Sequence, residues 1–119
     1  MGDRGNIVIR YGPNQHIFFY THWRGSGMGA DVHRALAKRD RWDDDAYLAR
    51  MIFDELGGVN GKGKDGIGIA LEPCDNEHDF LIVDVPGRRV IRAKGESLTA
   101  ENESWTFEEF VTNAPIGDW

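Results

Sequence analysis

The chain has 119 residues, of which 40% are hydrophobic and 29% are charged, a composition that predicts one globular domain over residues 1–119. Its net charge of -6 disfavours duplex nucleic acid as a partner, because that affinity comes from neutralising many phosphates. No apolar run approaches the roughly 20 residues that cross a bilayer, so we expect no membrane partner and no export signal. Cys74 is the only cysteine, which rules out an internal disulfide and favours a cytoplasmic location.

The first two predicted elements are strands that form a hairpin. Apolar and polar residues alternate along residues 6–11 and again along residues 16–22, as in half-buried strands. The turn sequence Gly-Pro-Asn-Gln at 12–15 joins them over a short distance. The pair is therefore expected to be antiparallel.

Two amphipathic helices are predicted next, over residues 30–41 and from Asp43 to the glycines at 57–58. In the first, Val32, Ala35 and Leu36 lie on one stripe. In the second, Asp43 is the expected N-cap, and glycine at the end takes the left-handed conformation that stops a helix.

The second half of the chain predicts three further strands, over residues 67–71, 80–85 and 88–94. In the first of these, Ile67, Ile69 and Leu71 are expected to face inward. The strand at 80–85 is apolar on both faces and is expected to lie centrally in the sheet, and the strand at 88–94 is basic.

The last predicted element is a helix that begins near Trp105, after a loose polar stretch at 96–104. Thr106 and Glu109 have the spacing of a capping box, and Trp105 and Phe110 that of a hydrophobic staple. The resulting order, β-β-α-α-β-β-β-α, predicts an α+β fold with two layers and a mostly antiparallel sheet.

The most informative motif is the glycine-rich turn at residues 23–31, which links the second strand to the first helix. Backbone N–H groups at a helix start are unpaired and lie at the positive end of the helix dipole, so they suit a phosphate or a carboxylate. The predicted ligand-binding residues come from this turn and from the lysine loop after the second helix: His22, Trp23, Arg24, Gly25, Ser26, Gly27, Gly29, Lys62 and Lys64.

Each of these residues has a chemical role in the hypothesis. Arg24 would pair with phosphate, Trp23 would stack on a base or ribose, and Lys62 and Lys64 would close over the anion. The spacing matches neither a Walker A loop nor a Rossmann fingerprint. The alternative is an ordinary turn whose glycines need left-handed angles, with Trp23 in the core and the lysine loop solvated.

Other clusters support weaker hypotheses. Arg88, Arg92 and Lys94, with Arg89 beside them, would bind an anion or an acidic partner, or would keep an edge strand soluble. The acidic loop at 72–79 matches no metal motif, so no metal site and no cofactor is predicted.

Four patterns carry a resemblance that spans most of the chain: Gly-Asn-Ile-Val at 5–8, Tyr-Thr-His-Trp at 20–23, Arg-Trp-Asp-Asp followed by Tyr-Leu-Ala-Arg at 41–50, and Trp-Thr-Phe-Glu-Glu-Phe at 105–110. They resemble a group of small, largely uncharacterised bacterial and phage proteins, which implies a shared fold and no established activity. By size and layout the chain is also similar to phage sponge proteins, which sequester cyclic nucleotide or cyclic ADP-ribose immune signals without cleaving them.

The sequence therefore predicts a non-enzymatic module that binds or sequesters a small phosphorylated ligand such as a nucleotide or cyclic nucleotide. A thin sheet would gain pocket walls by pairing with another copy, so a homo-oligomer is expected. Two alternatives stay open. One is a protein-interaction or structural subunit, and the other is a small hydrolase that uses His22 or His33 as a base.

Overall fold

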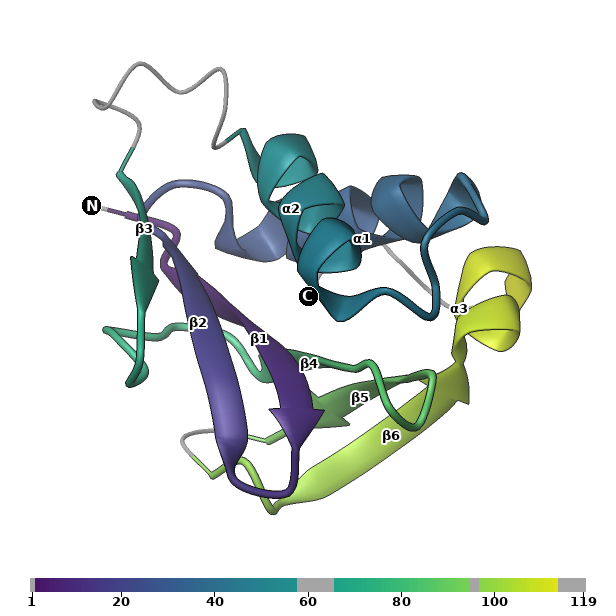
Figure 1. The fold of residues 1–119 in the computed structure, drawn as a ribbon. Helices are drawn as coiled ribbons and strands as arrows, with labels where there is room; N and C mark the ends of the chain where they lie inside the picture. Colours follow the sequence, from purple (N-terminus) through teal and green to yellow (C-terminus); the bar gives the residue numbers. More distant parts are fainter. Residues whose placement is uncertain (1, 58–65, 95–96, 114–119) are drawn as a thin grey trace.

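The computed structural model describes residues 2–57, 66–94 and 97–113. In this part of the chain, three α-helices lie on one face of a six-stranded sheet (Figure 1), which confirms the predicted two-layer α+β fold. The elements in chain order are β1 (Gly5–Gly12), β2 (Gln15–Thr21), the 3-10 turn η1 (Gly25–Gly27), α1 (Met28–Ala37), α2 (Asp45–Leu56), β3 (Ile67–Ala70), β4 (Phe80–Asp84), β5 (Arg89–Ala93), β6 (Glu101–Thr106) and α3 (Phe107–Asn113).

The strands lie side by side in the order β3-β2-β1-β4-β5-β6. Neighbours are antiparallel except β1 and β4, which pair in parallel with Ile7 opposite Leu81. The predicted β1–β2 hairpin is confirmed, with Ile7 opposite Phe19. β5 lies between β4 and β6, so the interpretation of the basic strand as a solubilising edge was wrong.

One strand was missed by the sequence analysis. Residues 101–106, expected to be part of a loose polar stretch and a helix start, form β6 and pair with β5. Glu101, Glu103 and Ser104 are exposed, so β6 shows no apolar alternation that would identify it. Its stability comes from backbone pairing with β5 and from the half-buried Trp105 opposite Val90.

Two helix boundaries differ from those predicted. α1 ends at Ala37 rather than near residue 41, and Arg39 and Arg41 follow it with φ of 54° and 62°. The N-cap of α2 is Asp44 rather than Asp43, and its carboxylate accepts a hydrogen bond from the Tyr47 N–H. Gly57 ends α2 with φ of 106°, as predicted.

The capping box of α3 is confirmed. Glu109 accepts from the Thr106 N–H at 2.8 Å, and Thr106 Oγ1 accepts from the Glu109 N–H at 3.0 Å. The rings of Trp105 and Phe110 lie 5.6 Å apart, which is the contact expected of the staple. With Thr106 as the N-cap, α3 begins at Phe107, directly after the last residue of β6.

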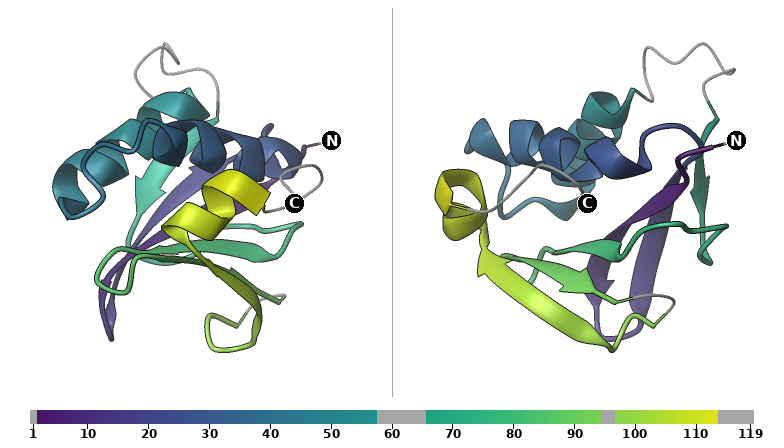
Figure 2. Two further views of the ribbon diagram at one scale, coloured as in Figure 1. Left: turned by 90° about the vertical axis from the view of Figure 1, so that its right-hand side faces the viewer. Right: turned by 180° about the vertical axis from the view of Figure 1, so that it is seen from behind.

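The core has two parts because both faces of the sheet are apolar. The larger cluster lies between the sheet and the helices and includes Ile9, Leu36, Leu56 and Phe110. A second cluster lies on the far face, where the two ends of the sheet cross at a steep angle (Figure 2). Its buried members come from four strands: Val8, Phe18, Phe80, Ile82, Ile91 and Ala93.

β3 departs from the predicted inward pattern. Ile67 packs at the margin of the larger cluster, whereas Ile69 is 62% exposed and Leu71, just beyond the strand, is 80% exposed. The reason is position: β3 is the edge of the sheet and contacts β2 alone among the described strands.

Candidate functional site

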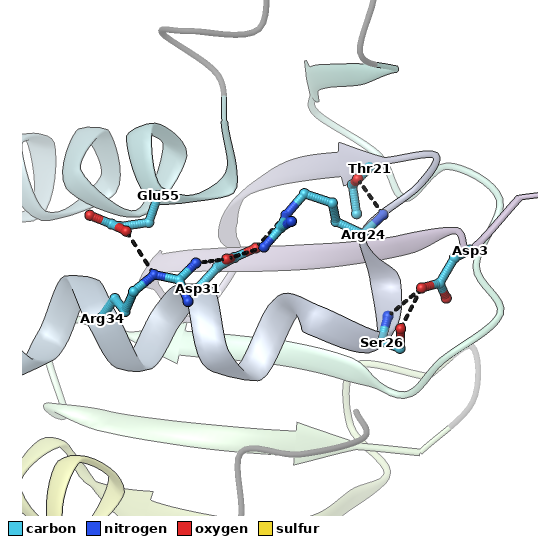
Figure 3. Close-up of polar contacts among 7 residues, drawn as sticks. All are labelled: Asp3, Thr21, Arg24, Ser26, Asp31, Arg34 and Glu55. Carbon is cyan, nitrogen blue, oxygen red and sulfur yellow. Dashed lines mark hydrogen bonds and ion pairs between the residues drawn. The ribbon is translucent and has the colours of Figure 1, made fainter.

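The glycine-rich turn holds a negative charge, and the chain itself supplies it. Asp3 lies in the segment before β1, residues 2–4, called here the N-terminal arm. Its carboxylate accepts hydrogen bonds from the Ser26 N–H at 3.0 Å and from Ser26 Oγ at 2.5 Å (Figure 3). The Gly25 N–H donates to the Asp3 carbonyl, and the Gly27 N–H donates to the Arg24 carbonyl. The prediction that these three N–H groups are free for a ligand was therefore wrong.

Of the three turn glycines, Gly25 is explained by packing. Gly25, Gly27 and Gly29 are absent from the described residues with positive φ, so the alternative explanation from left-handed angles was also wrong. A Cβ on Gly25 would lie 2.7 Å from the Asp3 carbonyl oxygen and against the His78 ring. Gly25 is thus required where the N-terminal arm passes close to the turn.

Asp3 also contacts His78, with His78 Nε2 2.5 Å from Asp3 Oδ1. The carboxylate lies between Ser26 and His78, so the imidazole does not reach the hydroxyl. In a nucleophilic triad the histidine occupies the middle position and takes the proton of the serine. The Ser26–Asp3–His78 chain is therefore a structural tie and not a nucleophilic site.

These contacts determine how Asp3 titrates. Burial by itself raises the pKa of Asp3, but hydrogen bonds from Ser26 and His78, together with the charge of His78, outweigh burial and lower the pKa to about 2. The unfolded value is 3.8. The stabilisation is therefore complete above about pH 4 and is lost as the pH falls toward 2.

Asp3→Asn is expected to lower the free energy of unfolding by about 1 kcal/mol at pH 7, a figure reduced for solvent screening because the side chain is 33% exposed. The difference between wild type and variant should shrink to near zero as the pH falls from about 4 to about 2, because the wild-type carboxylate then becomes protonated. Urea unfolding at a series of pH values measures this. A difference that stays constant with pH would contradict the assignment.

A second network joins the turn to both long helices. Asp31, in the first turn of α1, is fully buried and accepts from Arg24 Nε at 3.0 Å and Arg24 Nη2 at 2.5 Å (Figure 3). Arg34 Nη2 donates to the same carboxylate, and Arg34 Nε donates to Glu55 of α2 at 3.0 Å. Lys38 also contacts Glu55. One buried carboxylate thus fixes two guanidinium groups side by side.

The charges in this network shift the pKa of two groups in the expected directions. Hydrogen bonds to Asp31, together with its charge, raise the pKa of Arg24. Hydrogen bonds from Arg34 and Lys38 lower the pKa of Glu55. Both groups are therefore ionised at neutral pH, and charged side chains hold one another in place in this network.

A cleft of about 450 Å³ opens beside this network. The residues that line it come from the segment after β2, from α1, from the end of α2 and from the start of β3: Trp23, Arg24, Arg34, Glu55, Leu56, Gly57 and Ile67. Arg24 and Arg34 are about half exposed. A guanidinium group has five N–H donors, so each retains donors beyond those used in the contacts described above.

Trp23 projects from the turn with 54% of its surface exposed, so the alternative that places it in the core was wrong. Its ring meets that of His22 edge-on at a centroid distance of 4.1 Å. His22 Nδ1 in turn lies 3.1 Å from the Tyr20 hydroxyl and accepts from Arg4 Nε at 3.4 Å. An exposed indole braced by a second ring provides one flat wall of the cleft.

The structure brings together some of the predicted site residues and separates others. Trp23 and Arg24 line the cleft, and His22 supports Trp23 from behind. The residues of the turn behind the cleft are Gly25, Ser26 and Gly27, and Gly29 is buried in α1. Lys62 and Lys64 lie outside the described residues.

Sequence reasoning missed the two other charged residues of the cleft, Arg34 and Glu55. Arg34 follows Asp31 by three positions, a helical spacing that brings the two together on α1. That spacing is a usable signal for Arg34. Glu55 lies on another helix, and only the packing of α1 against α2 brings it to Arg34, so no local pattern identifies it.

Three of the remaining candidates, Arg89, Arg92 and His33, are engaged in structural contacts. Arg92 donates to Asp79 at 2.9 Å, and Arg89 donates to Ser104 at 2.5 Å. His33 Nε2 donates to the Val111 carbonyl at 2.8 Å. Within residues 2–57, 66–94 and 97–113, no group of three His, Cys, Asp or Glu side chains is arranged to hold a metal ion.

Comparison of the chain with protein-family models, with curated proteins and with solved structures found no match. The resemblance to small bacterial and phage proteins thus stays a prediction, and the functional argument depends on the cleft. None of the helices in the described residues has the length and apolar character that crossing a bilayer requires.

Proposed function

We propose that this chain binds a small phosphorylated ligand of the nucleotide class in the cleft beside Trp23, and that it holds the ligand without converting it. The observation that carries the proposal is the exposed indole of Trp23 in the same cleft as two guanidinium groups fixed by one buried carboxylate. This combination supplies a stacking surface and pre-oriented donors for phosphate, the two contacts that nucleotide recognition needs.

The mode of binding differs from the one the sequence predicts. The turn N–H groups are used within the chain, so phosphate recognition falls to the unused donors of Arg24 and Arg34. Glu55, 22% exposed at the cleft, provides an acceptor for a ribose hydroxyl or a base amino group. The mixed charge of the cleft favours a nucleotide over inorganic phosphate, which lacks the ribose and the base and cannot reach Glu55 while its oxygens contact the guanidinium groups.

Holding without conversion is supported by the surroundings of the histidines. His22 contacts Tyr20, Arg4 and Trp23, and His33 contacts Val111. No described carboxylate orients either ring as a general base requires. A hydrolase is therefore the weaker candidate, and an anti-defence role as a sponge for cyclic nucleotide signals follows only from the resemblance.

Trp23→Ala is expected to weaken nucleotide binding by roughly 10-fold to 100-fold, because stacking on an indole contributes about 1–3 kcal/mol. The measurement is isothermal titration calorimetry against mono-, di- and cyclic nucleotides, with analysis of the recovered ligand by mass spectrometry. Tyr47→Ala is the matched control, since Tyr47 is 55% exposed and lies away from the cleft. Its affinity should equal that of wild type.

Three results would contradict the proposal. They are the absence of heat and thermal stabilisation with every nucleotide at millimolar concentration, equal losses for the two aromatic variants, and recovery of a cleaved ligand. The last result would favour the hydrolase, and His22→Ala and His33→Ala would then identify the base.

A further inference from the structure

Among the strands of the described residues, β3 has a neighbour on one side only, and its other edge is uncharged. Its residues, Ile-Gly-Ile-Ala at 67–70, carry no charge, and Ile69 and Leu71 are largely exposed. Natural edge strands are commonly protected by charged side chains, by proline or by a covering element. The opposite edge follows that rule, because β6 exposes Glu101 and Glu103.

The hydrogen-bond register shows which backbone groups of β3 point away from β2. The His22 N–H donates to the Gly66 carbonyl at 2.8 Å. Bonded and non-bonded pairs alternate along antiparallel strands, so Gly68 and Ala70 bond to β2 through their pairs Tyr20 and Phe18. The N–H and C=O groups of Ile67 and Ile69 therefore face outward.

The β1 side of the sheet supports the same register. The Val85 N–H donates to the Arg10 carbonyl, so alternate β1 residues from Arg10 point toward β4, and Ile7 and Ile9 bond to β2. The β2 partners of Ile7 and Ile9 are Phe19 and Ile17. The backbone groups of Phe18 and Tyr20 therefore face β3, in agreement with the His22 contact.

We propose that this edge is where a second copy of the chain binds, by antiparallel pairing of β3 with β3 about a two-fold axis at Ile69. In this register Ile69 lies opposite Ile69 of the second copy, and Ile67 lies opposite Leu71 of the second copy. The outward N–H and C=O groups of Ile69 pair with those of Ile69 of the second copy, and those of Ile67 pair with Leu71 of the second copy. The exposed aliphatic side chains meet on the helix side of the sheet.

Charge favours this arrangement over the alternative pairing between copies. Pairing β3 of one copy with β6 of another would place Glu101 and Glu103 against a strand that offers no cation, and it would build a head-to-tail ring or filament of several copies. The self-pairing brings no charged side chain of β3 against its equivalent. It also closes after two copies, which leaves no free β3 edge.

The inference goes beyond the proposed function and does not depend on it. Ile67 nevertheless also lines the cleft, so Leu71 of the second copy would extend the apolar wall next to Trp23. Loss of pairing would then weaken ligand affinity without abolishing it, because Arg24 and Arg34 belong to one chain.

Analytical ultracentrifugation of the full chain, from about 1 to several hundred micromolar, tests the proposal, because an interface this small is expected to be reversible. Wild type should sediment at twice the chain mass of 13.4 kDa at the higher concentrations. Ile69→Pro should stay monomeric, since it removes one outward N–H and an edge strand tolerates proline where its N–H faces solvent. Ile69→Lys should give the same result without altering the backbone.

The matched control is Ser104→Pro, which removes an outward N–H from the other edge strand. Phe107 N–H donates to the Arg88 carbonyl, so Ser104, opposite Ile91, points its backbone away from β5. This variant should dimerise like wild type. A wild type that is monomeric at all concentrations, a ladder of larger species, or an Ile69→Lys protein that still dimerises would each overturn the proposal.

Discussion

Replacing Asp31 with asparagine is expected to lower the free energy of unfolding by about 2 kcal/mol, and the melting temperature by roughly 8 °C. The carboxylate is fully buried and accepts from two guanidinium groups. The amide keeps the shape but loses the charge, and its NH2 group would point a donor at a donor. The loss stays near the low end for a buried ion pair because Arg24 and Arg34 remain half exposed to water.

Glu108→Gln is the control for Asp31→Asn. Glu108 also accepts from two nitrogens of one arginine, Arg39, but both side chains are exposed. Exposed pairs contribute little, so the loss of stability should be much smaller than that caused by Asp31→Asn. Chemical denaturation of both variants in parallel measures the contrast, and equal effects would mean that burial of Asp31 does not matter.

The second large effect is expected at Gly25. Gly25→Ala should lower the free energy of unfolding by about 2 kcal/mol or more, because the new Cβ would meet the Asp3 carbonyl at 2.7 Å and the His78 ring. The carbonyl belongs to the backbone and cannot rotate aside. The N-terminal arm must therefore shift, and the tie from Asp3 to Ser26 weakens with it.

Gly27→Ala provides the comparison within the same turn. A Cβ there would lie 3.7 Å from Arg24 Nη2, an ordinary contact, and φ at Gly27 is -97°. The change should alter stability by less than about 0.5 kcal/mol, with a small gain from the restricted unfolded chain. Thermal unfolding of the two variants tells them apart. A larger loss for Gly27→Ala than for Gly25→Ala would show that the packing of the turn is misassigned.

Elements with their own local signals were predictable from the sequence. The β1–β2 hairpin, the glycine stop of α2 and the capping box of α3 each depend on residues close together in the chain. β6 was missed because its stability comes from β5, and its exposed residues carry no alternation. Ile69 was expected to face inward because the sequence pattern does not reveal which strand forms the edge.

The candidate site shows a similar division. The turn at residues 23–31 does attract a carboxylate, as the physical chemistry of a helix start predicts. The sequence does not reveal that this carboxylate belongs to Asp3, which precedes β1 and lies more than twenty positions before the turn in the chain. Arg24 lies at an open cleft because the Asp31 carboxylate accepts hydrogen bonds from its guanidinium group and from that of Arg34.

The parallel contact between β1 and β4 has a consequence for how the chain folds. β1 lies in the interior of the sheet, yet its partner on one side is made only after both long helices. Closing so long a loop is slow compared with forming a hairpin or a helix. During synthesis, the β1–β2 hairpin must therefore wait until β4 has left the ribosome, with the Arg10 carbonyl unpaired and with Val8 not yet packed against Phe80 and Ile82. Refolding in vitro should be limited by this late step, and nascent chains that end before residue 80 should be sensitive to proteases.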